Sequence, residues 1–230
     1  MRRELTRVHR RPPSREPARR YLIVCEGESE RAYFGWVKQQ IGDRRLVLRV
    51  ELGKSSDPRA VVRTALNLSS ADPKHGLDQQ FDEVWAVFDW DGHTDRVREA
   101  MEMMRQADEE RRDPSIPTCF RCALSNPCFE LWYLWHVCDY MKPGCTKEQV
   151  QRAWKTQCPE YAKSAVPVGM LDVGGYEQAV RRAASARRSH DGVRAYPEDR
   201  PSTGVDELME SLAVQYRGFR GLDANAPLPF

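Results

Sequence analysis

The sequence predicts an α/β fold in which helices flank a mainly parallel sheet. Short apolar runs typical of buried strands lie at 21–25, 83–88 and 118–124, and segments with apolar residues at helical spacing lie between them. This alternation is typical of strand–helix–strand units, whose crossover connections make neighbouring strands parallel. From residue 139 onward, proline and glycine interrupt short helical segments, which predicts an α-helical extension on the α/β core.

Each element follows from its own pattern. Continuous or alternating apolar residues predict strands at 21–25, 46–52, 83–88 and 118–124. Apolar residues three and four apart predict helices at 31–41, 58–68, 95–107, 127–137, 177–188 and 205–216. Pro127 is expected in the first turn of its helix, where proline is favoured. We divide the chain into a basic tail at 1–19, an α/β core at 20–140 and a mainly helical extension at 141–230.

Composition restricts the class of protein. The chain has 230 residues, of which 40% are hydrophobic and 30% charged, so it can bury a full core. A net charge of +2 does not by itself imply a polyanionic partner. The arginine-rich tail is read either as disordered or as an arm that binds nucleic acid. With no signal peptide or membrane-spanning run, and with 7 cysteines that suit reduced thiols, we expect a cytoplasmic protein with no membrane association.

Acidic residues follow two of the predicted strands. Glu26 directly follows the run YLIVC, Gly27 allows a sharp turn, and Glu30 lies four residues after Glu26; Asp89 and Asp91 follow the run EVWAVF. The carboxyl ends of parallel strands meet at one edge of a sheet, where ligands gather. If the two strands are neighbours, we therefore expect these four carboxylates to converge.

Converging carboxylates repel one another and raise one another's pKa, so they need a cation. Mg²⁺ or Mn²⁺ would suit them, because hard divalent ions prefer oxygen ligands and keep waters for a phosphate substrate. The alternative is that these acids are first-turn residues that favour a helix N-terminus. Glu28 suits this second reading, as an exposed residue of the helix's first turn.

The stretch SNPCFELWYLWH, at 125–136, adds polar residues to an aromatic helix. Ser125 and Asn126 either cap the helix or hold a metal-bound water or phosphate. Glu130 lies among apolar residues, where a lone carboxylate is costly, so it either completes the metal site or pairs with an arginine. His93 is close enough in sequence to Asp91 to support the site or to act in acid–base chemistry.

The stretches CEGESERAYF, VFDWDGH, SNPCFELWYLWH and PSTGVDELMESL together resemble the RloB-like proteins, over about residues 19–213. The core of that family looks like a Toprim domain, which is Rossmann-like. The resemblance implies that Glu26, Asp89 and Asp91 bind metal and that Glu30 fills the second place of E-G-x-x-E. It also implies further site residues, which are Ser125, Glu130 and, in the stretch YAKS, Lys163 as a stabiliser of transition-state charge.

The resemblance implies a metal-dependent nuclease in bacterial anti-phage defence, acting with an ABC-type ATPase encoded alongside it. The sequence has no phosphate loop of its own, which fits that partner. Nucleic acid, most readily DNA, would also contact the basic helix through Arg181, Arg182, Arg187 and Arg188. Two alternatives stay open: a binding module without catalysis, and nucleotidyl or phosphoryl transfer on a small nucleotide. An oligomer is possible.

Overall fold

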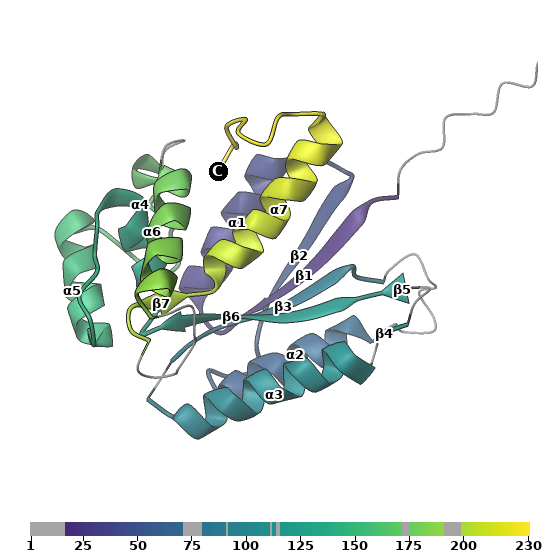
Figure 1. The fold of residues 1–230 in the computed structure, drawn as a ribbon, viewed down its shortest axis with the longest axis horizontal. Helices are drawn as coiled ribbons and strands as arrows, with labels where there is room; N and C mark the ends of the chain where they lie inside the picture. The colour runs from purple at the N-terminus through teal and green to yellow at the C-terminus, as the bar shows by residue number, and fades with distance from the viewer. Residues whose placement is uncertain are drawn as a thin grey trace, which may run out of the picture.

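The computed structural model describes residues 17–70, 80–90, 92–110, 112–113, 116–171, 175–190 and 199–230. It confirms the predicted α/β class: a five-stranded sheet has the order β2-β1-β3-β6-β7, and only the last strand runs antiparallel to its neighbour (Figure 1). The strands of this sheet are β1 (Arg19–Cys25), β2 (Leu46–Leu52), β3 (Glu83–Asp89), β6 (Cys119–Asn126) and β7 (Ser202–Thr203). A separate antiparallel pair consists of β4 (Arg112–Asp113) and β5 (Ile116–Pro117).

Helices cover both faces of the sheet. They are α1 (Glu28–Ile41), α2 (Pro58–Ser69), α3 (Thr94–Glu110), α4 (Glu130–Val137), α5 (Lys147–Gln157), α6 (Gly175–Ser189) and α7 (Val205–Arg220), with a short 3₁₀ helix at Val168–Met170. Successive side chains of a strand point to opposite faces. Leu22 and Val24 therefore pack with α2 and α3, whereas Tyr21 and Ile23 pack with α1 and α7 on the other face (Figure 1). Two separate hydrophobic clusters result, one on each side of the sheet.

Two helices begin three residues away from the predicted position. α1 begins at Glu28, three residues earlier than expected, because Gly27 is in extended conformation as its N-cap. α4 begins at Glu130, so the expected place of Pro127 in its first turn is wrong. Asn126 still pairs with Ser202 in the sheet, and a residue before proline is disfavoured in helical conformation, so the helix starts after this turn.

Residues 141–230 do more than add helices. This region contributes β7, which pairs with β6 of the core and completes the sheet. Large side chains of α5 and α7, such as Trp154 and Leu208, share one buried cluster with Trp132 of α4 and with Tyr21 and Ile23 of β1. α4, α5 and α6 gather at one end of the sheet (Figure 1). Among the helices that the structure describes, none is long and apolar enough to cross a membrane.

Candidate functional site

Glu26 and Asp89 lie together at the carboxyl edge of the sheet. β1 and β3 are parallel neighbours, with Cys25 opposite Val87, so the residues that follow them meet at one edge. The backbone N–H of Glu26 donates to the carbonyl oxygen of Val87 at 2.9 Å. In return, Oε2 of Glu26 accepts a hydrogen bond from the backbone N–H of Asp89 at 3.0 Å. The predicted adjacency of the two strand ends is therefore confirmed, and a side-chain hydrogen bond fixes it.

Glu30 points back to the same edge from the first turn of α1. Its side chain is buried, and a Cβ atom at Gly27 would lie only 2.9 Å from its Oε2. Burial raises the pKa of Glu30, and with the added effect of the charges of Glu26 and Glu130 the pKa reaches about 7. Glu28, two residues earlier, is exposed and pairs with Arg31 at 2.7 Å, as expected of a first-turn residue outside the site.

Asp89 is buried, but only one of its two carboxylate oxygens has a partner. Its side chain is only 9% exposed, and Oδ2 lies 3.2 Å from Nζ of Lys147. Oδ1 is buried and has no hydrogen-bond partner. Burial raises the pKa of Asp89 well above its usual value, and the negative charge of Glu30 adds to the rise. An unpaired buried carboxylate oxygen is costly, which marks this position as one that a ligand could satisfy.

Glu130 is the first residue of α4. It is buried, and its charge acts on Glu30, on Asp89 and on the thiol of Cys128. Burial raises the pKa of Cys128, and the charges of Asp89 and Glu130 raise it further, so this thiol stays protonated. The structure thus places four acids within electrostatic reach of one another: Glu26 after β1, Glu30 in α1, Asp89 in β3 and Glu130 in α4.

Ser125 and Asn126 do not cap α4, which has no side-chain hydrogen bond at its N-cap. Both are fully buried and contact the extension instead. Oγ of Ser125 lies 3.1 Å from Oγ1 of Thr203, and Nδ2 of Asn126 donates to Oδ1 of Asp199 at 2.6 Å. The helix-cap reading is therefore wrong; these residues fasten residues 199–203 to the end of β6.

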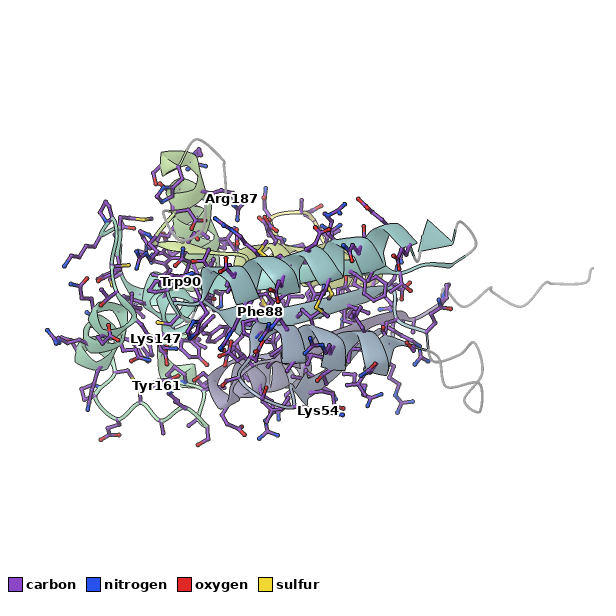
Figure 2. The ribbon with its side chains drawn as sticks, turned by 90° about the horizontal axis from the view of Figure 1, so that it is seen from below. Lys54, Phe88, Trp90, Lys147, Tyr161 and Arg187 are labelled. Atoms are coloured by element: carbon purple, nitrogen blue, oxygen red, sulfur yellow. The ribbon has the colours of Figure 1, made fainter. Side chains whose placement is uncertain are left out.

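Two residues near the acids were not predicted. Lys147, at the start of α5, pairs with Asp89, and the hydroxyl of Tyr161 donates to Oγ of Ser29 at 2.8 Å. Figure 2 shows Lys147 and Tyr161 toward the same end of the molecule as Trp90, the residue that follows Asp89. Burial alone would lower the pKa of Lys147, but the charge of Asp89 and its hydrogen bond outweigh burial and raise it.

Lys163 is exposed, two residues beyond the tyrosine that contacts Ser29. The stretch YAKS therefore does approach the site, although through Tyr161. The charges of Glu130 and Glu30 act on the phenol of Tyr161, whose pKa is raised mainly by burial. The sequence signal for Tyr161 was its place in the stretch YAKS, because a tyrosine hydroxyl can donate a hydrogen bond to a site residue.

Asp91 lies outside the described residues. His93 is exposed immediately before α3, and its carbonyl oxygen accepts a hydrogen bond from the N–H of Val97 at 3.2 Å. Its suggested part in acid–base chemistry stays a prediction.

The predicted phosphate-binding arginines of α6 fall into two pairs. The exposed pair consists of Arg181 and Arg188. Arg182 donates to Oδ1 of Asp139 at 2.8 Å and also to the carbonyl oxygen of Trp135. Arg187 forms a short ion pair with buried Asp206 in the first turn of α7. The second pair is half-buried and joins α6 to the α4 end and to α7, whereas the first pair is exposed.

The acids suit a hard cation by kind, although they do not surround one point. Within the described ranges, no three His, Cys, Asp or Glu side chains are grouped so that they could hold a metal ion. Two observations nevertheless fit a cation: Oδ1 of Asp89 is buried without a partner, and Gly27 leaves room for the Glu30 carboxylate. All donors are carboxylate oxygens, which Mg²⁺ and Mn²⁺ prefer.

The fold and this edge together define an α/β protein with an acidic site at the carboxyl ends of parallel strands, the usual position of ligands in such sheets. The model of the RloB-like protein family matches residues 21–212, and the chain therefore belongs to the RloB-like family. A search of curated proteins and a search of solved structures found no match.

Proposed function

We propose that the chain is a Mg²⁺- or Mn²⁺-dependent Toprim-type nuclease that hydrolyses phosphodiester bonds of nucleic acid. The observation that carries the proposal is Asp89, a buried carboxylate with one unpartnered oxygen, on which the charges of Glu26, Glu30 and Glu130 act. Four acids whose charges act on one another are unfavourable unless a cation or protons neutralise them. A divalent ion does so and leaves room for a phosphate, which favours this chemistry.

The residues divide the work by position. Glu26 and Asp89, joined by a hydrogen bond at the strand ends, would hold the metal, with Asp91 and Glu130 as further ligands. A bound Mg²⁺ supplies activation of water and stabilisation of the leaving oxygen. Glu30, buried next to these residues, is suited to accept a proton from the attacking water.

The partners follow from the family and from the surface. Membership in the RloB-like family supports action in bacterial anti-phage defence with an ABC-type ATPase on a separate chain. Arg181 and Arg188 are exposed on α6 and can contact the phosphate backbone. Contacts of this kind bind without regard to base sequence and weaken as salt is raised.

The test is cleavage of a supercoiled plasmid by the purified chain with its neighbouring ATPase, in Mn²⁺. Asp89→Asn should lower the rate by about 10²-fold or more, because it removes a charged ligand of the metal. Glu30→Gln should also lower the rate, because it removes the proposed proton acceptor. Glu28→Gln is its matched control, since the two residues are two apart on α1 and only Glu30 is buried. Wild-type rates in Asp89→Asn, with wild-type stability, would remove the assignment.

A second function, binding without catalysis, is favoured by one observation: the described acids are not grouped around a single metal position. Binding of a fluorescent DNA duplex in EDTA separates the two functions. The binding module predicts equal affinity for wild type and for the double variant Glu26→Gln/Asp89→Asn, with no cleavage by either. The nuclease predicts cleavage that depends on Mn²⁺ and is lost in the double variant.

A further inference from the structure

Lys147 is placed against the electrostatic preference of its own helix. It is the first residue of α5, where unpaired N–H groups carry partial positive charge and lysine is unfavourable. Residues that break a local rule without local gain are concentrated at functional sites. The unfavourable position of Lys147 is compensated by a residue far away in the sequence: Nζ of Lys147 lies 3.2 Å from Oδ2 of Asp89 at the end of β3.

The start of α5 is held firmly enough to fix this placement. Thr146 and Gln149 form a capping box, in which Oγ1 of Thr146 accepts from the N–H of Gln149 at 3.4 Å and Oε1 of Gln149 accepts from the N–H of Thr146 at 3.2 Å. Cys145 is buried in the core, and the N–H of Gly144 donates to the carbonyl oxygen of Arg200 at 3.1 Å. These contacts hold the first residue of α5, Lys147, next to Asp89.

The contact between Lys147 and Asp89 is partly open to solvent. Its side chain is 38% exposed, whereas that of Asp89 is 9% exposed, so the ammonium group lies at the opening and the carboxylate beneath it. The contact uses Oδ2 alone and leaves Oδ1 without a partner. Lys147 also interacts electrostatically with Glu30 and with Glu130. An ammonium group on a flexible stem is also easier to move than a bidentate arginine.

We propose that Lys147 is the built-in counter-ion of the acidic site: it holds Asp89 until a divalent cation takes its place, and the displaced ammonium group then contacts a phosphate of bound nucleic acid. This inference rests on the proposed function. The two cations compete because both require the Asp89 carboxylate and repel each other at short range. Once displaced, the ammonium group stays at the opening, where a phosphate is the anion that the site is proposed to admit.

The first experiment measures Mn²⁺ binding by titration calorimetry on the full chain, without nucleic acid. Lys147→Met should bind Mn²⁺ about five- to ten-fold more tightly than wild type, because a competing positive charge is gone. Lys155→Met, an exposed lysine on the same helix, is the matched control and should match wild type. Unchanged or weaker Mn²⁺ binding in Lys147→Met would overturn the proposal.

Thermal unfolding separates this role from a structural one. In EDTA, Lys147→Met should melt below wild type, because the acids lose their counter-ion; in saturating Mn²⁺ the difference should disappear. A lysine that only packs would lower the melting temperature equally in both conditions. An equal decrease would therefore contradict the proposal.

The second experiment measures the affinity for a short fluorescent duplex with phosphorothioate linkages, in Mn²⁺ and in EDTA. In Mn²⁺, Lys147→Met should lose several-fold in affinity, with a salt dependence reduced by about one phosphate contact. In EDTA it should bind like wild type, and an equal loss in both conditions would contradict the transfer to phosphate. Asp89→Asn tests the proposed function separately: if wild type and Asp89→Asn both fail to bind Mn²⁺, the metal site itself is wrong.

Discussion

The carboxylate of Glu26 accepts a hydrogen bond from the backbone N–H of Asp89 at 3.0 Å, so one acid of the site positions the other. This relationship separates the charge of Glu26 from its structural contact. Glu26→Gln keeps an oxygen that can accept the bond, whereas Glu26→Ala removes it. We expect Glu26→Gln to abolish Mn²⁺-dependent cleavage at near wild-type stability, and Glu26→Ala also to lose about 1–2 kcal/mol in urea unfolding. Equal stability of both variants would show that the bond contributes nothing.

Gly27 is expected to matter for the position of Glu30 rather than for folding. A Cβ atom there would meet Oε2 of Glu30 at 2.9 Å, and the flexible end of that side chain can move aside. Gly27→Ala should therefore weaken Mn²⁺ binding by calorimetry while the free energy of unfolding changes by less than about 1 kcal/mol. Gly35→Ala is the control: nothing lies within 4 Å of its Cβ, and alanine in this helix should stabilise by about 0.5–1 kcal/mol. Wild-type Mn²⁺ affinity in Gly27→Ala would contradict the expectation.

Tyr161 and Lys163, both in the stretch YAKS, should affect stability differently, because Tyr161 is hydrogen-bonded and Lys163 is exposed. Tyr161→Phe removes the hydrogen bond to Ser29 and should cost about 1 kcal/mol in unfolding free energy. Lys163→Ala changes an exposed side chain and should stay within about 0.5 kcal/mol of wild type. Any fall in plasmid cleavage by Lys163→Ala would then report a direct contact with substrate. Unchanged cleavage would exclude the predicted role of Lys163 in stabilising transition-state charge.

The neighbourhood of Glu26 and Asp89 was predictable because it follows from local patterns. Apolar runs identify strands, parallel strands end at one edge, and residues directly after them must meet there. Glu30 was predictable for a similar reason, since it lies four residues after Glu26 and near the start of a helix. These inferences need only sequence distances of a few residues and one assumption, that β1 and β3 are neighbours.

The remaining parts of the site depend on contacts between distant segments. Asn126 bonds to Asp199, 73 residues away, and Lys147 reaches Asp89 from 58 residues away, so no local pattern pairs them. Lys147 carried one usable signal, a cation directly after the N-cap Thr146 of a helix with a Gln three residues on. The internal pairing of Arg187 with Asp206 had none, because a basic helix looks the same whether its arginines face solvent or a buried acid.

Arg181 and Arg188 should carry nucleic-acid binding by α6, because both are exposed. The double variant Arg181→Glu/Arg188→Glu should weaken duplex binding and lower the slope of log affinity against log salt, without a loss of stability. Arg182→Ala is the contrasting variant, since it removes the contacts with Asp139 and Trp135 and should destabilise the protein. Fluorescence polarisation at several salt concentrations measures the slope. An unchanged slope in the double variant would place the nucleic acid elsewhere.

Asp206 should make the stability of the protein depend on pH. Burial raises its pKa to about 6, although Arg187 acts in the opposite direction. Since the unfolded value is about 4, the folded protein binds the proton more tightly, and this contribution to stability is present below about pH 4 and lost as the pH rises through about 6. Asp206→Asn cannot lose a proton, so relative to wild type it should gain about 2–3 kcal/mol in unfolding free energy between about pH 4 and pH 7. Urea unfolding across this range measures the difference, with the exposed Asp223→Asn as control. A difference between wild type and Asp206→Asn that is constant with pH would show that the pKa of Asp206 is the same in the folded and unfolded protein, so that Arg187 compensates fully for its burial.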